Sequence, residues 1–110
     1  MAGKFEIKRS SNGMFSFSLK AANNEIILSS ETYMRRAGAA RGVESVKKNG
    51  AIDQRFQKKT ASNGEVYFIL KASNGKTLGR SETYKTERAC ANGIESVKKN
   101  APTAAVVDLT

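Results

Sequence analysis

Histidine is absent from this 110-residue sequence, and cysteine occurs once, as Cys90. Histidine is the commonest general base and the commonest metal ligand, so both roles lack their usual residue. One cysteine without histidine cannot form a structural zinc cluster or a Cys–His nucleophile pair. The glycines lack the spacing of a phosphate-binding or dinucleotide-binding loop. The sequence therefore predicts that the protein is not an enzyme, and that it has no catalytic residue, metal or cofactor.

Long apolar segments are also missing. No run approaches the roughly 18 residues typical of a membrane-spanning helix, and the start, MAGKFEIKRS, lacks the apolar stretch of a signal peptide. We therefore expect a cytoplasmic protein with no membrane partner. The length suits a single domain, because a chain of this size buries roughly 65% of the surface that its unfolded form exposes.

A repeat organises the sequence. GVESVKKN at 42–49 returns as GIESVKKN at 93–100, and a comparison of residues 4–50 with 55–101 at a constant offset of 51 gives 22 identities in 47 pairs. SETY occurs in both copies at the same offset, at 30–33 and 81–84. Two copies are too few for a solenoid. We expect one domain over 1–110, built from repeat one (1–51) and repeat two (52–110) around a pseudo-twofold axis.

Each copy opens with a pattern typical of strands. Phe15, Phe17 and Leu19 alternate with polar residues, as do Val66, Phe68 and Leu70. A strand over 4–8 precedes this one, and the Ser-Asn-Gly between them tolerates positive φ, as a hairpin turn requires. A third strand is expected over 25–29 and over 76–80, so each copy begins with a three-stranded antiparallel meander.

A helix follows each SETY segment. In copy two Thr86 is a good N-cap, and Cys90, Ile94 and Val97 form an apolar stripe that should face the sheet. Cys90 is interpreted as a small core residue. Gly42 and Gly93 interrupt the two helices at a cost of about 1 kcal/mol each against alanine, which predicts close packing against a neighbouring element. Asn49-Gly50 suits a helix end with a left-handed residue.

The segments after the helices place two demands on one stretch of chain. Residues 104–109 (AAVVDL) predict a closing strand, and the offset of 51 puts their counterparts where copy two begins. Residues 51–59 must therefore finish copy one and start copy two with no intervening loop. A strand shared or exchanged between the halves would satisfy both demands.

These motifs resemble the YegP-like family of small bacterial proteins, with the tandem pattern F-x-I-x-(K), S-N-G, L-K-A-x-N, S-E-T-Y and N-G-I-E-S-V-K-K-N. Copy two matches more closely, since copy one has Arg41 for Asn92 and Asn24 for Gly75. The resemblance covers nearly the whole chain. It implies an α+β fold, in which two β3-α-β repeats form a single mostly antiparallel sheet with helices on one face and C-terminal strands swapped between repeats. It implies no activity.

The remaining signal is positive charge. Nineteen Lys and Arg against ten Asp and Glu give +9, divided as +5 in residues 1–51 and +4 in 52–110. Strand alternation sends a set of cations and one aromatic to the sheet face opposite the helices. This predicted interaction surface consists of Lys4, Lys8, Lys20, Arg55, Lys59, Tyr67 and Lys71. Cations with a stacking aromatic are what a sheet needs to bind single-stranded nucleic acid.

Other interpretations compete with nucleic-acid binding. Lysines commonly keep an open sheet face soluble and discourage edge pairing, and Glu44 and Glu95 suit surface pairs with the lysines four residues later. The same alternation puts Met14, Ile26, Leu28 and Ile69 outside the helix-covered face, where exposed apolar side chains would suit a protein partner. We expect a monomeric protein-interaction or structural module, with sequence-independent nucleic-acid binding as the alternative. Ser30 and Ser81 are interpreted as turn caps.

Overall fold

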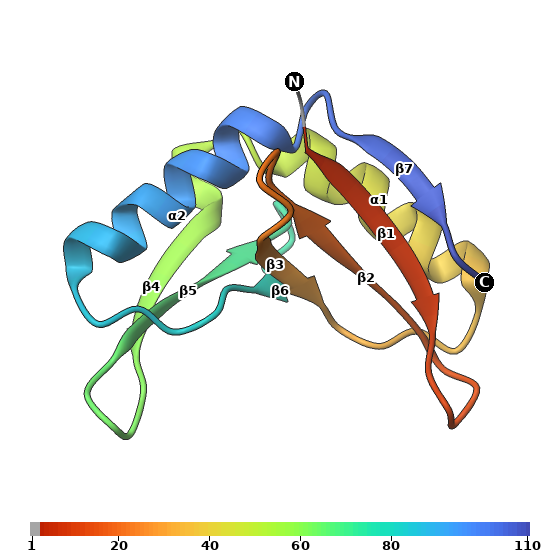
Figure 1. Cartoon of the computed structure of the whole chain (residues 1–110), viewed down its shortest axis with the longest axis horizontal. Helices are drawn as coiled ribbons and strands as arrows, with labels where there is room; N and C mark the ends of the chain where they lie inside the picture. Colours follow the sequence, from red (N-terminus) through yellow and green to blue (C-terminus); the bar gives the residue numbers. More distant parts are fainter. Residues whose placement is uncertain (1–2) are drawn as a thin grey trace.

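The computed structural model describes residues 3–110, which form a seven-stranded sheet and two α-helices (Figure 1). The sheet order is β4-β5-β6-β3-β2-β1-β7. Residues 1–2, part of the start used to predict location, lie outside the described range. The elements are, in chain order, β1 (Lys4–Arg9), β2 (Phe15–Lys20), β3 (Ile26–Ser30), α1 (Arg36–Asn49), the 3-10 turn η1 (Asp53–Arg55), β4 (Phe56–Thr60), β5 (Val66–Lys71), β6 (Thr77–Arg80), α2 (Glu87–Asn100) and β7 (Ala105–Asp108).

The strand alternation produces the core. Phe5 and Leu19 are opposite one another in the antiparallel β1–β2 pair, and Phe56 and Leu70 repeat this in β4–β5. Phe17 and Phe68 are buried in one hydrophobic cluster with the apolar stripes of α1 and α2. The predicted α+β fold, with a mostly antiparallel sheet built from tandem repeats, is confirmed.

Turn chemistry is the same in all four hairpins of the described chain. An asparagine accepts a backbone N–H two residues later at 3.0–3.1 Å: Asn12, Asn23, Asn63 and Asn74. The residue after each asparagine has φ between 73° and 86°. Three of these residues are glycine and the fourth is Asn24, which tolerates the left-handed region better than most side chains.

The SETY segments have a structural explanation. Ser30 and Ser81 Oγ accept the N–H groups of Phe17 and Phe68, at 2.8 and 3.0 Å, and each hydroxyl donates to the following glutamate carbonyl. The serines thus continue a strand ladder where the backbone turns away. Tyr33 pairs with Phe15 through two backbone hydrogen bonds of 2.7 Å, as Tyr84 pairs with Val66.

The repeated helical glycines make room for these tyrosines. A Cβ on Gly42 would lie 2.5 Å from the Tyr33 hydroxyl, and one on Gly93 would lie 2.4 Å from that of Tyr84. Each tyrosine ring in turn stacks on the phenylalanine of its half, Tyr84 on Phe68 with centroids 6.5 Å apart. The prediction of close packing at both glycines is therefore correct.

The helix ends differ from the sequence prediction in one respect. Thr86 Oγ1 accepts the Ala89 N–H at 3.0 Å, as an N-cap does, but Gly50 has φ −66° and is not left-handed. Gly50 is small for another reason: a Cβ there would lie 2.6 Å from the Val46 carbonyl oxygen and 2.8 Å from the Cβ of Ala101. The left-handed cap is thus a wrong prediction, and the requirement comes from crowding by the last turn of α1 and by the end of α2.

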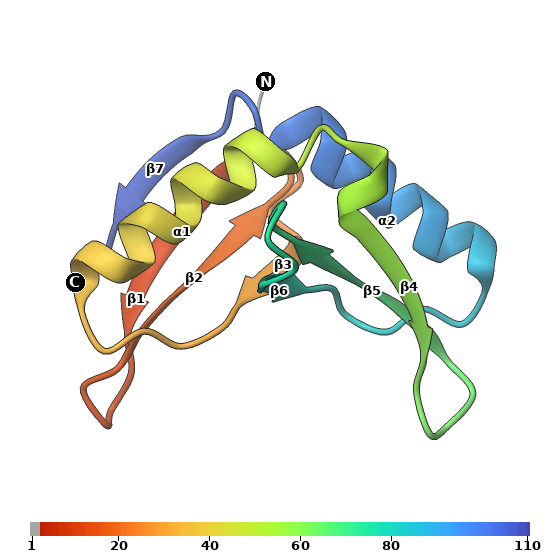
Figure 2. The ribbon, with the colours of Figure 1, turned by 180° about the vertical axis from the view of Figure 1, so that it is seen from behind.

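A pseudo-twofold axis passes between the halves. Rotation by 180° about the vertical nearly repeats the view with α1 in place of α2 (Figures 1 and 2). At the axis a residue meets its own counterpart: Ser29 pairs with Arg80, and Gly50 packs on Ala101. The two copies differ at both positions, because one site on the axis cannot hold two large or two like-charged side chains.

Strand β7 is where the halves differ most. It pairs in parallel with β1 of the other repeat, which is the predicted exchange. Its counterparts in repeat one, residues 54–57, are divided between η1 and β4. Asn100 Oδ1 accepts the Gly3 N–H at 2.9 Å, whereas Asn49 Oδ1 accepts the Arg55 Nε–H at 3.0 Å. Each repeated asparagine thus binds the residue that precedes the first strand of a repeat, β1 or β4.

Candidate functional site

The open sheet face, opposite the helices, carries most of the predicted interaction surface. Six of its seven members lie on strands and alternate with core residues, among them the cross-strand pairs Lys4–Lys20 and Lys59–Tyr67. Arg55 does not join them, because it ends η1 and its side chain is tied to Asn49 at the end of α1. The face therefore unites Lys4, Lys8, Lys20, Lys59, Tyr67 and Lys71.

Glu6 neutralises part of this face. Its carboxylate lies 3.0 Å from Lys20 Nζ and 3.5 Å from Lys4 Nζ, and the residue is buried. The hydrogen bond from Lys20, with help from Lys4, lowers the pKa of the Glu6 carboxyl against the opposing effect of burial. Lys4 and Lys20 are therefore engaged within the protein.

Arg80 stands at the centre of the open face and was absent from the predicted set. Its guanidinium lies 4.8 Å from the Tyr67 ring centroid, a cation–π distance. It belongs to a row of residues in register across all seven strands: Gln57, Ile69, Arg80, Ser29, Ser18, Glu6 and Val107. The sequence pattern does not indicate this position, because it follows from the pairing of β3 with β6, which sets Arg80 beside its counterpart Ser29.

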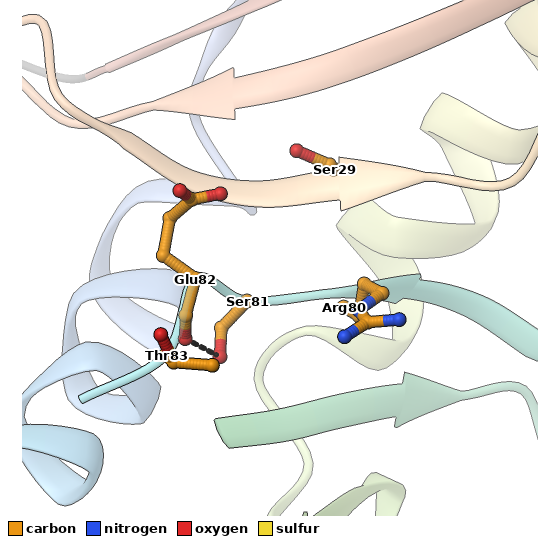
Figure 3. A pocket seen from close by; sticks show the side chains of 5 residues that line it. All are labelled: Ser29, Arg80, Ser81, Glu82 and Thr83. Atoms are coloured by element: carbon orange, nitrogen blue, oxygen red, sulfur yellow. Dashed lines mark hydrogen bonds between the residues drawn. The ribbon is translucent and has the colours of Figure 1, made fainter. Parts of the chain in front are cut away.

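A shallow pocket of about 270 Å³ lies beside Arg80 (Figure 3). Ser29, Ser81, Glu82 and Thr83 complete its lining. The Glu82 and Arg80 side chains point in different directions, and the Ser81 hydroxyl is held by the Glu82 carbonyl. The pocket thus holds opposite charges, and one of its hydroxyls, that of Ser81, is already engaged.

The predicted apolar patch does not form. Leu28 is fully buried in the core, opposite Leu19, because the β2–β3 register shifts after Leu19 and reverses the expected orientation. Ile69 does lie on the open face but is only 9% exposed. Ile26 is 38% exposed and Met14 is half-buried. The apolar surface predicted outside the helix-covered face is therefore largely covered by the protein itself.

The two outer edges of the sheet are unequal. β7 covers β1, and the Ile7 carbonyl accepts the Leu109 N–H at 2.9 Å. In the equivalent half β4 pairs with β5, and within residues 3–110 no strand lies on its other side. By the offset of 51, Lys58 of β4 stands where Ile7 stands in β1. Its N–H and C=O therefore point outward with no strand to receive them.

The burial and the charge of the side chains also differ between the β1 and β4 edges. Phe5 is fully buried beneath the β1–β7 pair, whereas its counterpart Phe56 is only half-buried. Ile7 is 1% exposed, whereas Lys58 is exposed. Lys58 and Lys59 lie on opposite faces of β4, which has no acidic residue. The uncovered edge is therefore basic, with part of an aromatic ring accessible.

Cys90 is fully buried, and burial raises the pKa of its thiol. In the part of the chain that the structure describes, no three His, Cys, Asp or Glu side chains gather as metal ligands. The same residues include no helix long and apolar enough to cross a membrane.

Comparison with known proteins places the chain among relatives. The model of the domain of unknown function DUF1508 matches twice, over residues 10–57 and 61–108. The chain belongs to this family. Among its members, the UPF0339 protein YegP of Escherichia coli O157:H7 is 47% identical over 110 residues, with both chains fully covered. A UPF0339 protein of Bordetella pertussis is 50% identical over 110 residues, covering all of this chain and 98% of the relative.

Solved structures of family members share the fold. The NMR structure of yegP from E. coli, titled a protein of unknown function, has a TM-score of 0.94 and 46% identity, covering all of this chain and 95% of that one. A UPF0339 protein from Shewanella oneidensis gives 0.93 and 45%, with coverage of 100% and 93%. The YegP-like resemblance and the tandem repeat are thereby confirmed.

Proposed function

We propose that the protein is a non-enzymatic interaction module that binds an extended segment of a partner protein as an added strand on β4. The observation that carries this proposal is the difference between the two edges: β1 is covered by β7, and the equivalent edge at β4 is uncovered. Strand addition gains affinity from main-chain hydrogen bonds and specificity from alternate side chains. The lack of histidine and the buried thiol of Cys90 support the absence of catalysis.

The edge also offers apolar area. Phe5 is fully buried next to β7, whereas Phe56 is half-buried at the uncovered edge, so an added strand would have apolar surface to cover. Such burial contributes about 25 cal/mol per Å² of apolar surface. A bound strand would thus be held by backbone pairing and by contact with one aromatic ring.

Selection from a random displayed heptapeptide library on the full-length chain tests this function. We expect selected peptides to shift the backbone amide resonances of Phe56–Thr60, and Lys58→Pro to abolish binding. Proline removes an outward N–H from β4 but no β4–β5 ladder bond. Lys58→Ala, which keeps the N–H, is the matched control and should retain binding. Peptides that bind elsewhere, or that tolerate Lys58→Pro in a folded protein, would refute the proposal.

Polyanion binding by the open face is the second candidate, favoured by Arg80. This residue adds a central cation to Lys59 and Lys71, although Glu6 already engages Lys4 and Lys20. A salt titration with a fluorescent single-stranded oligonucleotide, duplex DNA and heparin tests it. A log-log slope of about three or more, with loss on Tyr67→Ala, supports a nucleic-acid surface. Weak binding that is equal for heparin contradicts it.

A cytoplasmic monomer is the state that we propose for this module. One chain supplies both halves of the sheet, and two β4 edges facing each other would bring like-charged lysines together. Sedimentation should give a monomer at micromolar concentration, and cell fractionation should recover the protein with the cytoplasm. A stable dimer or a membrane-bound pool would contradict this state.

A further inference from the structure

We infer that the strand that adds to β4 is acidic and runs parallel to it, with an apolar residue opposite Phe56 and a carboxylate opposite Lys58. This inference rests on the proposed strand addition and names the partner's chemistry. The molecule contains its own template, since β7 already occupies the equivalent position on β1.

The template fixes direction and register. β7 pairs in parallel, with Val106 opposite Phe5, Val107 opposite Glu6 and Asp108 opposite Ile7. The register of β1 with β2 is repeated by β4 with β5, from Phe5–Leu19 and Phe56–Leu70 onward. At both edges, equivalent residues therefore direct their N–H and C=O groups outward. An added strand can form hydrogen bonds with the outward groups of Lys58, as the Leu109 N–H does with the Ile7 carbonyl.

The side chains of β4 then determine which residues the added strand should carry. The residue equivalent to Val106 would pack beside Phe56 and cover its accessible ring. The residue equivalent to Asp108 would lie beside Lys58, and the next one beside Lys59 on the other face of the sheet. Opposite charges directly across two strands attract, and like charges repel. An acidic segment is therefore favoured over a basic one.

A second copy of the chain fits this edge poorly. Antiparallel pairing of two β4 strands would bring Lys58 and Lys59 of each copy together. The β7 strand of a second copy is already engaged, since its Asp108 carboxylate binds Arg36 at the start of α1. The counterpart of Arg36 on α2 is Glu87. An Asp108-like carboxylate would therefore meet Glu87 in place of an arginine, and Lys58 would be the cation that attracts it.

Glu87 supplies a gain-of-function test. Glu87→Arg restores at the second edge the arginine that Arg36 provides at the first. The variant should bind an acidic strand more tightly than the wild type. A merely structural role for Glu87 would leave the preference between acidic and basic strands unchanged.

The experiment uses the full-length chain and two capped synthetic heptapeptides. The acidic probe has the sequence of residues 104–110, AAVVDLT, and the basic probe is the same peptide with Asp108→Lys. Amide shifts are followed during titration, and a nitroxide on the first peptide residue reports direction. We expect shifts over Phe56–Thr60, tighter binding of the acidic probe by roughly 3- to 10-fold, and broadening nearest Phe56.

Charge variants complete the design. Lys58→Glu should invert the preference between the probes. Glu87→Arg should strengthen the preference for the acidic probe. Lys59→Glu, which faces the leucine of the probe, should weaken the acidic probe less than Lys58→Glu does, and Lys8→Glu, at the counterpart position in the covered half, should leave its binding unchanged. Spectra of the free variants establish that each is folded, and Glu87→Arg keeps the test decisive if Lys58→Glu fails to fold.

The outcomes separate this inference from the proposed function. If peptides bind at β4 without a charge preference, the acidic composition is wrong. If the broadening is greatest near Thr60, the parallel direction is wrong. Either result leaves the proposed strand addition intact. Failure of both probes to shift β4, together with failure of the displayed library, overturns both. Shifts of β4 that grow with protein concentration in the absence of peptide identify a second copy as the occupant and overturn the inference.

Discussion

Substitution of Gly93 by alanine tests the explanation of the repeated octapeptide. In an exposed helix the change would stabilise by about 1 kcal/mol, because alanine has the higher helix propensity. Here the new Cβ would lie 2.4 Å from the Tyr84 hydroxyl oxygen, 2.8 Å from Cζ of the same ring and 3.1 Å from the Phe68 ring. The Tyr84 ring cannot easily retreat, since it stacks on Phe68 and its backbone pairs with Val66.

Overpacking of this kind costs about 1–3 kcal/mol, which exceeds the gain in propensity. We expect Gly93→Ala to lower the free energy of unfolding by about 1–2 kcal/mol, measured by urea denaturation. Asn92→Ala, at the adjacent exposed position of α2, is the control and should change stability by less than about 0.5 kcal/mol.

A double-mutant cycle identifies the clash as the cause. In a Tyr84→Leu background the hydroxyl and ring are gone, so Gly93→Ala should become neutral or stabilising. The explanation is refuted if Gly93→Ala stabilises the wild-type chain, or if its cost is the same with and without the tyrosine.

Three further predictions concern the Ser81 hydroxyl, the Cys90 thiol and Asp108 in the C-terminal strand. Ser81→Ala leaves the buried N–H of Phe68 without its 3.0 Å partner and should cost about 1–3 kcal/mol in a thermal melt, whereas Thr83→Ala, at an exposed neighbour, should cost little. The fully buried Cys90 thiol, whose pKa is raised by burial, should react with Ellman's reagent only after unfolding; fast reaction in the native state would contradict its place in the core. The hydroxyl and N–H of Thr110, with Arg36, lower the pKa of Asp108 from 3.8 to about 2. Since the folded pKa is the lower one, this stabilising contribution is complete above pH 3.8 and is lost as the pH falls to about 2; Asp108→Asn should remove that part of the pH dependence, and an unchanged acid profile would count against the contact.

The sequence predicts the features that depend on local chemistry and on the repeat. The offset of 51 predicts two meanders, two helices and the role of Gly42 and Gly93, because both copies contain the same sequence pattern. Asparagine and glycine at fixed places in the turns predict the hairpins. The exchange of β7 follows from the double demand on residues 51–59, since that stretch is too short to form both a closing strand and an opening one.

The features that the sequence does not predict arise from irregular backbone or from contact at the axis. Strict alternation places Leu28 outside the core, and a register shift after Leu19 brings it in. Arg55 leaves the open face because η1 interrupts the strand pattern before Phe56. Arg80 becomes central only through its pairing with Ser29 across the pseudo-twofold axis. These outcomes depend on backbone irregularities and on contacts between the two halves. The hydrophobic pattern of a single copy does not predict either.

Amide hydrogen exchange at Lys58 shows whether the β4 edge is free to receive a strand. If the edge is uncovered, this outward N–H exchanges rapidly in the free protein at every protein concentration, whereas the N–H of its covered counterpart Ile7 exchanges slowly. At a concentration of about 100 Kd of the acidic heptapeptide, exchange at Lys58 should slow by roughly 100-fold, while exchange at Ile7 stays unchanged. Slow exchange at Lys58 in the free protein, or no change with bound peptide, would contradict an uncovered edge that receives an added strand.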